Sequence, residues 1–89
     1  MMKRILKYTI EEVTFSLSLP IGSIIRHFDF QGNQLMLWVE VNVTNFYENR
    51  HFVVFTTGEE FENLPTLKYI GTTCHHKHYT VFHLYEKVD

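Results

Sequence analysis

The chain has 89 residues, 45% of them hydrophobic and 16% aromatic, which supplies apolar surface for one small core but not for two. Its 8 Lys and Arg against 10 Asp and Glu give a net charge of −2, without the basic excess typical of nucleic-acid-binding proteins. A single cysteine excludes an internal disulfide bond, and no apolar run approaches the ~20 residues that a membrane helix needs. We therefore expect one domain over residues 1–89 that binds neither membrane nor nucleic acid.

The first two predicted strands cover residues 3–10 and 13–19. Apolar residues recur there at every second position, which is the period of a strand with one face buried. The alternation is clearest in the second strand, whose apolar members are Val13, Phe15, Leu17 and Leu19. Pro20 ends this strand, and Pro-Ile-Gly at 20–22 predicts a turn.

A hairpin follows over residues 23–43. The segments 23–30 and 35–43 both alternate, and the Gln-Gly-Asn-Gln stretch between them places Gly where a positive φ suits a tight turn. In the longer strand, Leu37 belongs to an apolar face, whereas Trp38 shares the second face with Glu40. A large indole on a partly polar face is typical of an interface or a stacking platform.

Three more strands are predicted at 51–57, 66–74 and 79–86. Residues 58–65 between the first two are irregular, with at most one short helical turn near 59–64. The last strand carries apolar residues on both faces, which predicts a place near the middle of a sheet. Six to seven short strands indicate an all-β fold, either a small antiparallel sandwich or a partly open barrel.

The order of several short motifs resembles a family of small domains of unknown function encoded by tailed bacteriophages. The motifs are Ile5-Leu-Lys-Tyr8, Leu19-Pro-Ile-Gly-Ser23, Leu37-Trp38, Arg50-His-Phe52, Thr57-Gly58, Tyr69-Ile-Gly-Thr72 and Val81-Phe-His-Leu-Tyr-Glu86. The resemblance spans nearly the whole chain. It implies a phage protein that acts in the cytoplasm of a bacterial host.

The Cys-His-His-Lys-His corner at 74–78 offers thiolate and imidazole groups, which are ligands that zinc accepts. Structural zinc sites, however, join two separated ligand pairs, and a single cluster on a hairpin tip is equally typical of a solvated turn. The corner also departs from the pattern of the phage family, so the resemblance does not support a metal site. We expect no metal and no cofactor.

Five residues are candidates for binding a ligand: Trp38, Arg50, Thr57, Gly58 and His83. The tryptophan could stack on a base, the guanidinium could clamp phosphate or carboxylate, and the Thr57-Gly58 amides could meet phosphate. Each has a structural alternative, which for Trp38 is a solvent-exposed position or a dimer surface. Arg50 could pair with Glu48 or Glu86, Thr57-Gly58 could be an ordinary strand exit, and His83 could be a core histidine held by one hydrogen bond.

The sequence holds no phosphate-binding glycine loop, paired catalytic carboxylates or nucleophile elbow, so we expect no catalytic residue and no enzyme. The leading hypothesis is a phage accessory binding protein that neutralises a host factor, in one version by sequestering a nucleotide immune signal in a pocket of a homo-oligomer. The alternative is an inhibitor that docks a sheet face or edge on a host enzyme.

Overall fold

The computed structural model describes residues 2–88, which form seven β-strands and no helix. The strands are β1 (Lys3–Ile10), β2 (Thr14–Pro20), β3 (Ile24–Gln31), β4 (Gln34–Asn42), β5 (Tyr47–Thr56), β6 (Leu67–Cys74) and β7 (Val81–Lys87). The prediction of an all-β fold is confirmed. Within residues 2–88, no helix of a length and apolarity that could cross a membrane is present.

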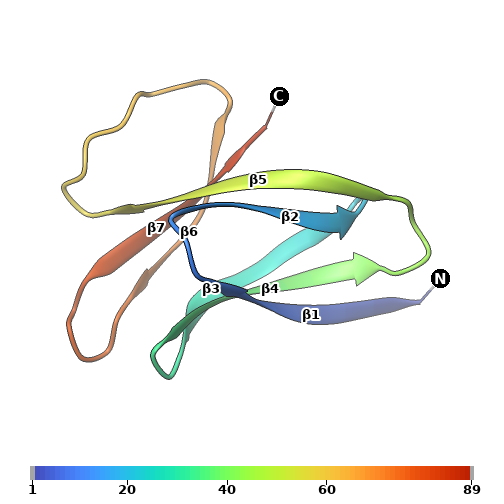
Figure 1. Ribbon diagram of the computed structural model, residues 1–89, viewed down its shortest axis with the longest axis horizontal. Helices are drawn as coiled ribbons and strands as arrows, with labels where there is room; N and C mark the ends of the chain where they lie inside the picture. Colours follow the sequence, from blue (N-terminus) through green and yellow to red (C-terminus); the bar gives the residue numbers. More distant parts are fainter. Residues whose placement is uncertain (1, 89) are drawn as a thin grey trace.

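The strands form two antiparallel sheets that pack as a thin sandwich (Figure 1). One sheet has the order β1-β4-β3 and the other the order β2-β5-β7-β6. Only the β3–β4 and β6–β7 hairpins join neighbours in sequence, so the remaining pairs unite segments that are far apart in the chain. The Cα atoms span 41 × 32 × 16 Å, and the short dimension fits two layers with one core between them.

The core lies between the sheets and follows the period-two pattern of the sequence. Leu37, Val39 and Val41 alternate along β4 toward the second sheet and are almost completely buried. From the other side, Phe52 is fully buried and stacks on Phe15 with ring centroids 5.1 Å apart. The alternation of apolar and polar residues in the sequence therefore identified which face of each strand the hydrophobic effect buries.

Strand β7 is the second of the two inner strands of its sheet, which confirms the inference from its two apolar faces. Leu84 points into the core and is fully buried. His83 and Tyr85 alternate with it and therefore point to the outer face of the sheet. The side chains that this outer face gathers are described in the next subsection.

Three segments differ in detail from the sequence-based expectation. The last strand begins at Val81 rather than at residue 79, because Tyr79 belongs to the preceding turn, where its φ is +58°. Strand β5 begins at Tyr47 rather than at residue 51, because Tyr47 pairs with Pro20 and Glu48 with Leu19 at the end of β2. Polar composition made residues 47–50 look like a loop, but pairing with a neighbouring strand overrides that weak preference. Residues 59–64, where one helical turn was allowed, are irregular.

The sheets meet along the edges of β3 and β6. The Thr73 hydroxyl donates to Oδ1 of Asp29 across this line at 2.5 Å, and this bond lowers the pKa of the Asp29 carboxyl. The two strands pack closely at this line: a Cβ on Gly71 would lie 3.8 Å from Cβ of Phe28, which is an ordinary van der Waals contact. The sandwich is therefore joined along one side, as in a partly open barrel.

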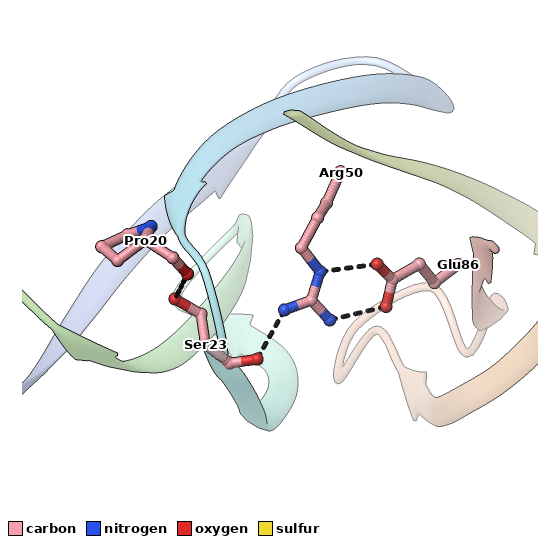
Figure 2. Close-up of polar contacts among 4 residues, drawn as sticks. All are labelled: Pro20, Ser23, Arg50 and Glu86. Atoms are coloured by element: carbon pink, nitrogen blue, oxygen red, sulfur yellow. Dashed lines mark hydrogen bonds and ion pairs between the residues drawn. The ribbon is translucent and has the colours of Figure 1, made fainter. Parts of the chain in front are cut away.

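A buried ion pair ties three parts of the chain together (Figure 2). Arg50 of β5 donates from Nε to one carboxylate oxygen of Glu86 on β7 at 2.6 Å and from Nη2 to the other at 2.7 Å. Its Nη1 donates to the carbonyl of Ser23, next to the turn that begins at Pro20. The side chains of Arg50 and Glu86 are only 18% and 7% exposed.

The turn that receives Arg50 explains the Leu-Pro-Ile-Gly-Ser motif. The N–H and hydroxyl of Ser23 both donate to the carbonyl of Pro20, and Gly22 has φ +85°. A positive φ at the third position is what a type II turn requires, and Gly adopts it without steric cost. The turn aims the Ser23 carbonyl at the guanidinium, so motifs at 19–23, 50–52 and 81–86 converge on one interaction.

We expect Arg50→Met to lower the free energy of unfolding by about 3 kcal/mol, because it leaves the buried Glu86 carboxylate without its partner. The double variant Arg50→Met/Glu86→Leu should be more stable than Arg50→Met, since it removes both charges. Urea denaturation monitored by Trp38 fluorescence measures both values. Arg26→Met is the control, because Arg26 is 51% exposed in its pair with Glu40 and its loss should cost under about 1 kcal/mol. Equal losses for Arg26→Met and Arg50→Met would contradict the structural role of the buried pair.

Candidate functional site

Four aromatic side chains gather on the outer face of the β2-β5-β7-β6 sheet, and we call this group the aromatic face: Phe55, Phe61, Tyr69 and Tyr85. Phe55 and Phe61 stack with centroids 4.1 Å apart, and Tyr85 lies 5.7 Å and 5.5 Å from these two rings. Tyr69 approaches Tyr85 at 5.5 Å from β6. Tyr69 and Phe61 remain 53% and 43% exposed, so the cluster presents apolar area to solvent.

The aromatic face arises from strand register and from one loop. Tyr85 on β7 is paired directly with Val53 on β5 and with Tyr69 on β6, and directly paired residues share one face of a sheet. Phe61 comes from the irregular segment between β5 and β6, which folds back so that its ring covers Phe55. The cluster therefore combines three strands and one loop.

His83 lies beside the aromatic face at the centre of a chain of hydroxyl groups. Its Nε2 is 2.8 Å from Oγ1 of Thr57, and its Nδ1 is 2.9 Å from Oγ1 of Thr72. The Thr72 hydroxyl is also 2.5 Å from the Tyr69 hydroxyl. Both ring nitrogens are thus satisfied, and the imidazole is held in one orientation on a surface where the core does not require it.

The hydroxyl chain has a direction that depends on the tautomer of His83. With the proton on Nε2, the imidazole donates to Thr57, whose own O–H then points away from the ring toward the solvent side. With the proton on Nδ1, the order reverses and Tyr69 supplies the outward O–H. Either way, the chain offers one hydroxyl donor to an incoming group beside the aromatic rings.

A shallow cleft of about 270 Å³ opens where the hydroxyl chain meets the rings. It is lined by Phe55, Thr56, Thr57, Gly58, Glu59, Phe61, His83 and Tyr85. Gly58 has φ +91°, a left-handed conformation that turns the chain away from β5 and leaves the cleft open. The lining contains one carboxylate and no Lys or Arg, so it is poorly suited to a phosphate group.

The structure brings together three of the five residues proposed from the sequence. Thr57, Gly58 and His83 share the cleft. Trp38 is on the outer face of the other sheet, where its ring lies 5.3 Å from His27, and Arg50 points between the sheets toward Glu86. Within one chain, the five residues therefore do not form a single pocket.

Arg50 pairs with Glu86, which is one of the structural alternatives that the sequence offered for it. Glu86 raises the pKa of Arg50 through this hydrogen-bonded pair. A guanidinium has five N–H donors, and three of them are used by Glu86 and Ser23. The arginine thus serves the fold rather than the cleft.

Sequence reasoning missed the four rings of the aromatic face and the hydroxyl of Thr72. Period-two alternation placed Tyr69 and Thr72 in one strand and His83 and Tyr85 in another, but not the pairing of these strands. Phe61 gave no signal, because nothing local predicts that an irregular loop will fold back on a sheet. The available clue was the surplus of large aromatics relative to the core of a small domain.

The histidine corner is a compact turn in which His75 is structural. Its ring is buried and meets the edge of Phe30 at 4.8 Å, and its Nδ1 accepts the backbone N–H groups of Lys77 and His78 at 3.1 Å and 3.2 Å. Cys74 is exposed. Among residues 2–88, no group of three or more His, Cys, Asp or Glu side chains is arranged to hold a metal ion.

Comparison with known proteins gives one match. All of residues 1–89 match the model of a domain of unknown function, DUF7352. The chain belongs to this family. No curated protein and no solved structure matches the chain. The family description assigns no activity, so the aromatic face and the His83 hydroxyl chain carry the functional argument for this DUF7352 domain.

We expect His75→Asn to weaken the pH dependence of stability, since Asn keeps an acceptor but cannot titrate. Burial, followed by the nearby charges of His78, His76 and Lys77, lowers the pKa of His75. In the unfolded chain His75 is protonated near pH 6.5, whereas in the folded chain it is protonated only at a lower pH. The stability that His75 contributes is complete above that pH and is lost as the pH falls through the lower folded-state pKa.

Urea midpoints measured from pH 8 to pH 5 test this expectation. The wild-type midpoint should fall over the acid half of the range, and the fall should be smaller for His75→Asn. His76→Asn is the matched control, because the His76 ring makes no hydrogen bond in the described part of the chain. If the two variants lost the same amount of pH dependence, the turn would not depend on the Nδ1 acceptor of His75.

Proposed function

We propose that the chain is a non-enzymatic binding domain that docks on a host protein through its aromatic face. The observation that carries this proposal is the exposed cluster of Phe55, Phe61, Tyr69 and Tyr85 beside a hydroxyl chain whose polar atoms are satisfied. Exposed aromatic rings with a few oriented polar groups are the composition of the centre of a protein interface. The rings are also held by mutual packing, which lowers the entropy lost on binding.

Charge supports a partner with a basic surface. Glu59, Glu60 and Glu62 flank Phe61 in the loop, and all three are exposed. Basic surfaces are typical of enzymes that act on nucleic acid, such as a polymerase or a nuclease. The resemblance to small phage domains supports a bacterial host as the source of this partner and host neutralisation as its purpose.

The geometry gives less support to the version in which the chain sequesters a nucleotide. A phosphate group in the cleft would meet the carboxylate of Glu59 and no guanidinium or ammonium group. Trp38 and Arg50, which were expected to stack the base and clamp the phosphate, lie elsewhere. A protein partner also fits an open and shallow surface better than a small molecule does.

The docking surface is tested with a double variant, Phe61→Ser/Tyr69→Ser, which alters two exposed rings of the aromatic face. The matched control is Phe46→Ser/Tyr47→Ser, which removes the same ring types at the other end of β5, from its first residue and the residue before it, where they are 60% and 88% exposed respectively. Tagged wild-type chain should capture one stoichiometric partner from bacterial lysate. The control should retain this partner, whereas loss of two aromatic anchors should weaken binding by about 30-fold or more.

Hydrogen exchange of the recovered complex should show protection in residues 53–61, 67–72 and 81–87, which carry the aromatic face. Capture by the face variant at wild-type yield, or loss of capture only in the Phe46→Ser/Tyr47→Ser control, would overturn the assignment of the docking surface.

A panel of cyclic nucleotides and ADP-ribose derivatives should leave the thermal midpoint of the chain unchanged. A ligand present at 100 times its Kd would add about 2.7 kcal/mol to the stability of the folded state. In a domain of this size that corresponds to a rise of roughly 10 °C or more, which thermal unfolding detects easily. Such a rise with any member of the panel would favour nucleotide sequestration over protein docking.

A further inference from the structure

The cleft beside the aromatic face has the composition of a cation-binding site. Three of the eight residues that line it are aromatic, namely Phe55, Phe61 and Tyr85, and a fourth is Glu59. None of the eight is Lys or Arg. Because an aromatic ring is negative on its two faces, rings and a carboxylate together favour a positive charge between them.

The three rings form a corner rather than a flat stack. Phe55 and Phe61 are stacked with 12° between their planes, whereas Tyr85 is inclined at 69° to Phe55 and at 57° to Phe61. The centroids lie 4.1 to 5.7 Å apart, and a ring attracts a cation within about 6 Å of its centroid. A cation placed against one of these rings therefore lies close to a second one. Phe61 is 43% exposed, so the corner is open to solvent.

The Glu59 carboxylate is held in place beside the rings. Its Oε1 accepts the N–H of Thr56 at 3.1 Å and the hydroxyl of the same residue at 3.2 Å. Among residues 2–88, no donor contacts the other oxygen, Oε2, and no ion pair involves Glu59, Glu60 or Glu62. The end of β5 thus orients the carboxylate, and one oxygen stays available for an incoming donor.

The hydroxyl chain supplies a second acceptor. With the proton of His83 on Nδ1, the Thr57 hydroxyl donates to Nε2, and both of its lone pairs are free to accept. The outward O–H of the chain is then on Tyr69, which is not part of the cleft lining. A cation in the cleft favours this tautomer, and it meets oxygen acceptors as well as rings.

We infer that the cleft binds an arginine side chain of the partner protein. A guanidinium is planar, so it can stack on a ring while its in-plane N–H groups donate to Glu59 and Thr57. It is also more weakly hydrated than an ammonium group, and Arg is enriched at the centres of protein interfaces. The cleft, at about 270 Å³, is smaller than most drug-sized pockets and takes one such side chain. This inference rests on the proposed docking function, and it names the residue that anchors the partner.

Short blocked peptides test the cleft without the partner. Isotope-labelled chain is titrated at low salt with acetyl-Gly-Arg-Gly-amide and with the same peptide carrying either citrulline or lysine in place of arginine. Citrulline is the matched control ligand, because it keeps the shape of arginine without its charge. We expect the arginine peptide to bind in the millimolar range, with NMR shifts confined to residues 55–61 and 83–85. Binding should be at least about 5-fold weaker with citrulline and about 3-fold weaker with lysine.

Two variants separate the charge from the ring. Glu59→Gln keeps the size of the side chain and an acceptor for Thr56 but removes the negative charge, and Phe61→Leu keeps apolar area but removes the π face. Each should weaken binding of the arginine peptide by about 5-fold. Glu60→Gln is the matched control, since it removes a neighbouring charge of the same loop that does not line the cleft. It should bind the peptide within about 2-fold of wild type.

The inference is overturned if the arginine peptide does not bind, if citrulline or lysine serves equally well, or if Glu60→Gln loses as much affinity as Glu59→Gln. Self-association of the wild type that Glu59→Gln abolishes would assign the cleft to a cation of a second copy and would also overturn it. Partner capture that depends on Phe61 and Tyr69 but is unchanged in Glu59→Gln overturns the arginine site alone. Binding of the arginine peptide by a chain whose partner capture ignores these rings overturns the docking function alone.

Discussion

The ion pair between Arg50 and Glu86 is the constraint on which the rest of the second sheet depends. Two charges taken out of water must satisfy each other, and here the guanidinium engages both carboxylate oxygens and the Ser23 carbonyl. Because side chains alternate between faces, a slip of one residue between β5 and β7 would turn Glu86 outward and bring Tyr85 into the core. The pair therefore fixes the register that places Phe55 and Tyr85 together on the outside.

Two histidines, His75 in the turn before β7 and His83 within β7, respond differently to a proton. His75 uses Nδ1 to accept two backbone N–H groups, and protonation of that atom breaks both bonds. His83 has hydroxyl groups on both nitrogens, and a hydroxyl can accept as readily as it donates. The hydroxyl chain therefore keeps its geometry in either protonation state, while the turn at 75–78 does not.

The sequence predicts those features of the fold that depend on residues close together in the chain, and it does not predict those that depend on distant residues. Alternation is local, so it located the strands and the inner position of β7. Pairing between β5 and β7 is not local, and only together with the β6–β7 hairpin does it bring Tyr69, Phe55 and Tyr85 to one face. Arg50 shows the same limit: the sequence offered Glu48, Glu86 or a ligand as its partner, and only the tertiary register selects Glu86.

The short motifs divide into two groups once the register is known. A structural role explains the first group, residues 19–23 with Arg50 and Glu86, because they form the buried ion pair and the turn that it contacts. Thr57, Gly58, Thr72 and His83 gather instead on the solvent side of the sheet, where neither core packing nor a backbone group calls for an imidazole between two hydroxyls. Ordered polar atoms beside exposed rings stabilise a folded monomer little, because water satisfies the same groups almost as well. These hydrogen bonds contribute more free energy once a partner excludes that water. The second group of motifs therefore marks a surface suited to binding rather than to stabilising the monomer.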